Sequence, residues 1–384
     1  MNNKYMRFAA TAILYAVFAV YLYRPYFNGF GSGRIQDLFV VNVCLASLGT
    51  YVLSRRWIDG FAESFFAGAI YGFGPFALGL AKFHPTAGFL FAAIPWLFCL
   101  AAFGPKGKYK PLRVPLSLLP FLVIVLFFKS AARFGLYPIP IKLKLNCADL
   151  AGLLAPLVTA KRNMTLVGFY HIPIASLVMG LSMLLVPFKD LFMNYDLRMR
   201  LRRTRTANQK SKMGHHVGYP TVVVNRKLLK GLAVRRFGIV AIFVVATILA
   251  FCDSFGQVSP IIWLAISVLC CSVLVGMGMQ GLISAGFADR KWILFTAIVM
   301  CILAIITLLL ATKYFQTFAG LGSGYARRLT ETAKMYILGA ITVAIFFFTT
   351  RAKLRIHPVR QILLCAVMAL DIFLGARFIV DTIL

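Results

Sequence analysis

Apolar segments long enough to cross a membrane recur along almost the whole chain, and this recurrence constrains the fold more than any other feature. A helix needs about 20 mainly apolar residues to cross the hydrocarbon core of a bilayer. By this measure we predict helices near residues 8–23, 36–54, 61–82, 86–103, 114–132, 166–187, 237–252, 260–283, 292–312, 334–350 and 361–380. The sequence therefore predicts an all-α, polytopic membrane protein with about eleven transmembrane helices.

The composition excludes a soluble protein and indicates contact with anionic lipids. Hydrophobic residues make up 60% of the 384 residues and charged residues 14%, and the mean hydropathy is +0.83. The 41 Lys and Arg residues outnumber the 11 Asp and Glu residues, for a net charge of +30. Such a balance favours contact with anionic lipids. We predict an integral protein of a bacterial cytoplasmic (inner) membrane and, because the basic segments lie beside a bilayer and hold few aromatic residues, no nucleic-acid partner.

A basic interval at residues 189–236 sets the orientation of the spans. It holds thirteen Lys and Arg residues but only Asp190 and Asp196. Basic segments beside spans stay in the cytoplasm, so we predict a cytoplasmic N-terminus and an external C-terminus. This divides the chain into a first membrane bundle of six helices at 1–188, a basic cytoplasmic connector at 189–236 and a second bundle of five helices at 237–384.

One predicted external loop, residues 133–165, departs from the charge rule. It carries five basic residues, and Pro138 and Pro140 make its first part extended. Residues 148–159 have the apolar pattern of a short interfacial helix. Two interpretations are open: an amphipathic helix that rests on the bilayer, or a lip over a site for a lipid phosphate. The basic residues of this loop are Arg133, Lys142, Lys144, Lys161 and Arg162.

Ionisable residues inside the spans are candidates for function because they are costly in lipid. Asp371 lies midway along the last predicted span, and Arg377 follows six residues later, which is not the spacing of a pair on one helix face. We therefore expect Asp371 to face a neighbouring helix or a cavity, in a structural or a functional role. Glu63 begins the third span, where a carboxylate is favourable at a helix N-terminus. No Cys or Cys/His pattern has the spacing of a metal site, so we predict no metal and no cofactor.

Several segments of the first half resemble multi-helix integral-membrane glycosyltransferases of the C type. The stretch Ala46–Arg56, with the sequence ASLGTYVLSRR, is similar to their "GxYLLxRR" helix, and Phe66–Pro75 is similar to their "AGxxYxFxP" helix. Ile94-Pro95-Trp96 matches a proline-marked span. Ala148-Asp149-Leu150, followed by residues 154–156 and 167–170, is similar to an external "ADL..LLxP" segment before a "GYxxL" span. The resemblance covers about residues 35–187.

This resemblance implies a polyprenyl-phosphate-linked sugar as donor, with transfer at the external membrane face. An external carboxylate would act as general base on the acceptor, and cations would hold the lipid phosphate. The candidate bases are Asp37 and Asp149. The first external loop lacks the acid or acidic pair of catalytic members, so both an active and a degenerate relative are open. The candidate substrate-binding residues are Arg24, Arg34, Lys142, Lys144, Arg162, His84 and His171.

Two other function classes are open. Six spans, a basic connector and a second set of spans resemble the major facilitator arrangement of secondary transporters, and residues 286–291 look like a conserved turn of that family. The second set has five spans and not six, and acids for proton coupling are scarce. The third class is a non-enzymatic membrane subunit without a ligand of its own.

Overall fold

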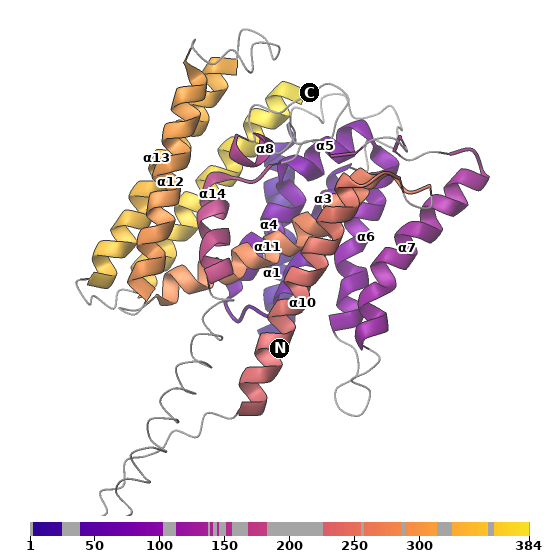
Figure 1. Cartoon of the computed structure of the whole chain (residues 1–384), viewed down its shortest axis with the longest axis horizontal. Coiled ribbons are helices and arrows are strands. Elements are labelled where there is room, and N and C mark those ends of the chain that lie inside the picture. The colour runs from indigo at the N-terminus through magenta and orange to yellow at the C-terminus, as the bar shows by residue number, and fades with distance from the viewer. Residues whose placement is uncertain are drawn as a thin grey trace, which may run out of the picture.

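A computed structural model describes residues 3–24, 39–102, 113–136, 139–140, 144–145, 151–155, 168–182, 226–254, 257–285, 289–312, 325–351 and 357–383. This part of the chain is helical and contains no β-strand, which confirms the predicted all-α class. Figure 1 shows the helices α1 (Asn3–Leu22), α3 (Phe39–Ser54), α4 (Phe61–Phe73), α5 (Pro75–Phe83), α6 (Pro85–Ala102), α7 (Arg113–Arg133), α8 (Ala151–Leu154), α10 (Arg226–Phe251), α11 (Pro260–Ser284), α12 (Arg290–Ala311), α13 (Tyr325–Arg351) and α14 (His357–Ile383), with a further helix over residues 171–182.

Each predicted span contains at least one helix of the structure. Six helices are long and apolar enough to cross a membrane: those within α1, α7, α11, α12, α13 and α14. Shorter apolar helices lie at 39–54, 86–99, 171–182 and 238–251. The chain is thus an integral membrane protein of the multi-pass type, and the total of eleven crossings stays a prediction. Of the predicted interfacial helix at 148–159, the structure describes α8 and Ala155.

The helices run up and down, and the two ends of the chain lie at opposite ends of the bundle (Figure 1). We call the end where α1 and α10 begin the N-terminal end, and the end where α14 finishes the C-terminal end. The assignment of the N-terminal end to the cytoplasm stays a prediction from the charge pattern.

Helix α11 forms the centre of the bundle. It is buried over its whole length, from Pro260 to Ile283 apart from Gln280. Its sequence is apolar on every side and holds no charged residue, which is typical of a helix surrounded by other helices. It packs against α10, α4, α6, α3 and α14. Helices from before and after the basic connector therefore share one core.

Small residues bring the helices of the N-terminal half together. A Cβ atom on Gly49 of α3 would lie 2.7 Å from Nε1 of Trp96 of α6, and this nitrogen donates to the Leu45 carbonyl at 3.1 Å. A Cβ atom on Gly68 of α4 would lie 2.2 Å from the Tyr15 hydroxyl. Among the described residues that carry the glycosyltransferase resemblance, these glycines and Trp96 thus lie at contacts between α1, α3, α4 and α6.

The helix at 171–182 is held between α11 and α13. On one side, a Cβ atom on Gly278 of α11 would lie only 1.6 Å from the Ser176 carbonyl oxygen, so the two backbones touch. On the other side, a Cβ atom on Gly339 of α13 would lie 3.1 Å from Cδ1 of Ile172. Close backbone contact at small residues is the usual basis of helix association in membranes. This packing fixes the position of His171, the first residue of the helix.

Candidate functional site

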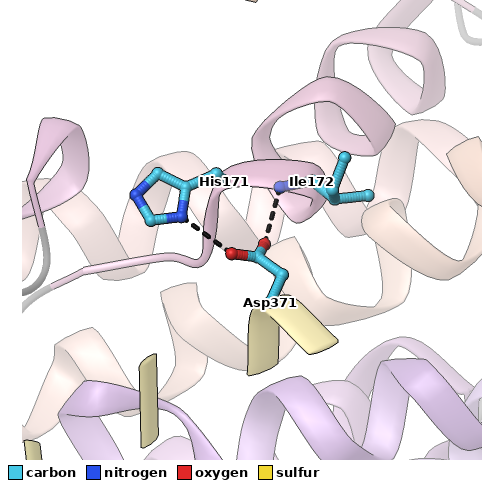
Figure 2. A network of polar contacts seen from close by, with 3 residues as sticks. All are labelled: His171, Ile172 and Asp371. Atoms are coloured by element: carbon cyan, nitrogen blue, oxygen red, sulfur yellow. Dashed lines mark hydrogen bonds and ion pairs between the residues drawn. The ribbon is translucent and has the colours of Figure 1, made fainter. Parts of the chain in front are cut away.

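The centre of the candidate site is a pair of ionisable side chains, His171 and Asp371. Nδ1 of His171 lies 2.8 Å from Oδ1 of Asp371, and the backbone N–H of Ile172 donates to Oδ2 at 2.8 Å (Figure 2). Both residues are only 1% exposed. The contact joins positions 200 residues apart in the sequence. We call His171 and Asp371 the His–Asp pair.

The local structure explains why a carboxylate is stable here. Ile172 lies in the first turn of its helix, where backbone N–H groups have no partner within the helix. Asp371 is directed at this turn from the middle of α14 and accepts one of these N–H groups (Figure 2). The positive end of the helix dipole also favours a negative charge at this point. Asp371 therefore faces a neighbouring helix, and Arg377 forms its ion pair with Asp381 instead, at 3.8 Å.

Aromatic and small residues close the site around the imidazole. The ring of Tyr336 on α13 meets the ring of His171 edge to face, with centroids 4.6 Å apart and an interplanar angle of 88°. Gly375, one turn after Asp371, leaves room for Tyr170: a Cβ atom there would lie 2.5 Å from the Tyr170 ring. These contacts leave the imidazole enclosed by protein.

One nitrogen of the imidazole has no partner. Nε2 of His171 is buried and forms no hydrogen bond among the described residues. An ionised Asp371 can only accept hydrogen bonds, so Nδ1 carries a proton. Nε2 is then an acceptor in the neutral imidazole and a donor in the protonated one. A buried polar atom without a partner is costly, and such atoms in proteins call for an explanation. The His–Asp pair is thus a group that can gain or lose one proton at Nε2.

A broken helix lies beside this pair. The sequence predicts one span over 61–82, but the structure has two helices, α4 and α5, which are separated by Gly74. Pro75 has no N–H to continue the helical bonding and its ring displaces the preceding turn, so the helix ends before it. The break leaves the Phe73 carbonyl without its helical donor, and the hydroxyl of the buried Tyr170 donates to it. Tyr170, the residue directly before His171, therefore connects the break to the His–Asp pair.

Five of the candidate residues from the sequence lie outside the described residues: Asp37, Asp149, Arg34, Lys142 and Arg162. Two others are at the surface. Arg24 is exposed at the end of α1, and Lys144 is exposed and pairs with Asp253. The glycosyltransferase assignment of these residues stays a prediction.

Lys144 belongs to a short stretch of chain that is fixed to the turn between α10 and α11. Its Nζ lies 2.8 Å from Oδ1 of Asp253, Leu145 N–H donates to the Ala250 carbonyl at 3.1 Å, and the Ser259 hydroxyl donates to the Pro140 carbonyl at 2.9 Å. The hydrogen bond and the charge of Asp253 raise the pKa of Lys144, and Lys144 lowers the pKa of Asp253 in the same way. Lys144 is thus occupied by a partner.

His84 and His171 are predicted to share one membrane face, but the described structure joins His171 to Asp371 and not to His84. His84 lies between α5 and α6, and its backbone N–H donates to the Leu80 carbonyl. Its Nε2 is buried and has no hydrogen-bond partner within the described ranges. Burial lowers the pKa of the His84 imidazole.

Sequence reasoning did not find Tyr170 or Tyr336 as parts of the site. The signals available were indirect: Gly339 is one turn from Tyr336, and Gly375 is one turn from Asp371, as expected where a helix must approach another group closely.

In the part of the chain that the structure describes, no group of three or more His, Cys, Asp and Glu residues could hold a metal ion. Comparisons of the chain with protein-family models, with curated proteins and with solved structures give no match.

Proposed function

We propose that this integral membrane protein is a secondary transporter that couples solute movement to protons, with the His–Asp pair as its proton-binding group. The observation that carries the proposal is the enclosed contact between His171 and Asp371, in which Nε2 of the imidazole has no partner among the described residues. Ionisable residues inside membrane bundles commonly belong to proton relays.

The burial of the pair favours proton exchange over direct contact with a large substrate. At 1% exposure, neither side chain is accessible to a bulky molecule in this conformation. A proton needs only a hydrogen-bonded route to Nε2, and its uptake changes the charge of the pair from −1 to 0. Such a change alters the attraction between α14 and the helix at 171–182, which gives the proton a direct mechanical effect on helix packing.

The break between α4 and α5 supports the same proposal. Binding sites of secondary transporters often lie near the middle of the membrane, at helices that are interrupted by Gly or Pro. Here Gly74 and Pro75 interrupt the helix, and the hydroxyl of Tyr170, the residue before His171, donates to the Phe73 carbonyl at the break. A major facilitator arrangement has an aqueous cavity at its centre, whereas α11 fills the centre of this bundle. The proposal therefore rests on the His–Asp pair and the helix break, and not on that resemblance.

Proteoliposomes loaded with a pH-sensitive dye provide the test. With an imposed pH gradient, pools of sugars, amino acids and organic acids are screened for proton movement that requires the solute. We expect Asp371→Asn and His171→Gln each to abolish gradient-driven uptake. Asp381→Asn is the matched control, because Asp381 lies on the same helix and is exposed. Unchanged uptake in Asp371→Asn would contradict the proposal.

A glycosyltransferase-like function is the second candidate, with a polyprenyl-phosphate-linked sugar handled at the external face. A major facilitator arrangement requires an aqueous cavity between two helix halves. In this bundle the centre is filled by α11, which is buried except at Gln280 and its last residue, and this favours the glycosyltransferase-like function over a major facilitator. Two exposed basic residues, Arg24 after α1 and Arg327 in the first turn of α13, could contact lipid phosphate. Transfer from a polyprenyl-phosphate sugar is to be measured in Asp37→Asn and Asp149→Asn; full activity in both variants would exclude these residues as the base.

A further inference from the structure

A second buried carboxylate, Glu63, lies near the N-terminal end of the bundle. It is in the first turn of α4 and is 5% exposed. Its side chain folds back over the residue before the helix: a Cβ atom on Gly60 would lie 1.7 Å from Oε2. Oε2 is buried and has no hydrogen-bond partner among the described residues. Glu63 is therefore an ionisable group in the core whose Oε2 lacks, in the part of the chain that the structure describes, the partner expected for a charge.

No group around Glu63 forms a hydrogen bond with its Oε2 within the described residues. On the preceding turn, Arg55 donates to the carbonyl oxygens of Asp59 and Gly60, so its guanidinium binds backbone and not the carboxylate. On α14, the thiol of Cys365 is near enough to interact with the charge of Glu63. Helix α11 contacts the Glu63 backbone at Gly276 and contributes no charged side chain. Within the described residues, Glu63 forms no ion pair.

The helix N-terminus explains only part of this arrangement. Its dipole stabilises a nearby carboxylate, and a glutamate at this position normally accepts a backbone N–H at the start of the helix. If the helix N-terminus alone explained the position of Glu63, Oε2 would accept such an N–H, but it has no donor among the described residues. A buried charge without a partner is strongly unfavourable, and protonation removes the charge. The unpartnered Oε2 therefore points to a proton as the ligand.

We propose that Glu63 is a second proton-binding site of this protein, reached from the N-terminal end of the bundle. Oε2 accepts a proton from a hydronium ion at that end, which forms a neutral carboxylic acid and leaves water; the reverse step returns the proton to water. This inference rests on the proposed proton-coupled function, since it gives that function an acceptor distinct from the His–Asp pair.

Helix α14 relates the two sites. Cys365, which interacts electrostatically with Glu63, lies six residues before Asp371, or about 9 Å along the axis of α14. Glu63 forms no hydrogen bond with His171 or Asp371 among the described residues, so it is a site distinct from the His–Asp pair. Both sites are contacted by α14, which packs against α4. The protonation of either site therefore acts on the same helix.

The sequence allows Glu63 to be observed alone. The chain has two glutamates, Glu63 and Glu331, and Glu331 is partly exposed and paired with Lys334. Protein carrying Glu331→Gln and grown with glutamate that is ¹³C-labelled at the side-chain carboxyl therefore reports on Glu63 only. Its carbonyl stretching band is recorded by infrared spectroscopy in uniformly oriented proteoliposomes, during pH steps applied to one side at a time.

We expect a carboxylic-acid band that grows when the pH is lowered at the N-terminal end, with no change for the same step at the C-terminal end. Glu63→Gln abolishes the labelled signal and confirms its assignment. A band that ignores both steps, or that follows only the C-terminal side, would overturn the inference. These outcomes are separate from those of the proposed function, which fails when His171→Gln and Asp371→Asn leave gradient-driven uptake intact, whatever Glu63 does.

Discussion

Asp371 accepts hydrogen bonds from both Nδ1 of His171 and the backbone of Ile172, and thereby joins α14 to the start of the helix at 171–182. One carboxylate thus has two roles. It holds the imidazole in place, and it replaces a missing hydrogen-bond acceptor at a helix terminus. The pair connects segments from the two sides of the basic connector, so its loss is expected to affect folding as well as function.

The first prediction concerns the removal of this carboxylate. Asp371→Ala leaves a buried imidazole and a buried backbone N–H without an acceptor. Breaking a buried pair by removal of one partner typically costs about 3–5 kcal/mol. The free energy of unfolding is to be measured by denaturant titration in detergent micelles. Asp381→Ala, which removes the exposed partner of Arg377, is expected to cost less than about 1 kcal/mol; equal losses in both variants would show that the buried contacts are not specific.

A second prediction tests the close packing that positions His171. In Gly278→Ala, the new Cβ atom would lie 1.6 Å from the Ser176 carbonyl oxygen and 2.7 Å from the Gly180 backbone nitrogen. Because both neighbours are backbone atoms, the helix at 171–182 must move away from α11. Overpacking of this kind costs about 1–3 kcal/mol or more, and we expect a lower thermal unfolding midpoint together with weaker gradient-driven uptake.

Gly238→Ala is the matched control for this substitution. Gly238 lies in α10, and a Cβ atom there would meet no atom within 4 Å. Alanine has a higher helix propensity than glycine by up to about 1 kcal/mol, so the midpoint should stay unchanged or rise. A fall in Gly238→Ala as large as that in Gly278→Ala would indicate that helix glycines matter here for a reason other than steric contact.

The third prediction concerns the hydroxyl that completes the broken helix. Tyr170→Phe removes the donor to the Phe73 carbonyl and leaves that buried oxygen unpaired. An unsatisfied buried acceptor costs about 1–3 kcal/mol. Denaturant titration should show this loss for Tyr170→Phe and almost none for Tyr21→Phe, because Tyr21 is 63% exposed. Equal stability of Tyr170→Phe and the wild type would mean that water replaces the hydroxyl at the break.

These features divide into those that the sequence predicts and those that depend on packing. The apolar runs predict the positions of the helices because burial in lipid requires length and hydrophobicity, as for α11. Hydropathy alone does not predict the break at Pro75 because the apolar run continues across it, although proline itself indicates a helix boundary. The partner of Asp371 could not be predicted, since a contact over 200 positions is set by how α14 meets the helix at 171–182. The hydrophobic periodicity of either segment alone does not predict that contact.

The last prediction concerns pH and the surface pair of Lys144 and Asp253. The pKa of Asp253 is lowered by Lys144, so its contribution to docking is full above about pH 4, the range of an ordinary aspartate, and is lost as the pH falls through the lowered pKa. The pKa of Lys144 is raised by Asp253, so its contribution is full below about pH 10 and is lost as the pH rises through the raised pKa. The pair therefore holds the stretch in place between these limits.

Hydrogen exchange of the Leu145 amide, which donates to Ala250, measures this docking directly. We expect its protection, taken relative to Lys144→Ala at each pH, to be constant across the neutral range and to fall at both extremes. The fall should be partial, because the bond from the Ser259 hydroxyl to the Pro140 carbonyl contains no titrating group and persists. Protection in Lys144→Ala equal to that of the wild type at neutral pH would show that the backbone and Ser259 bonds alone fix the stretch, and that the ion pair contributes nothing to its position.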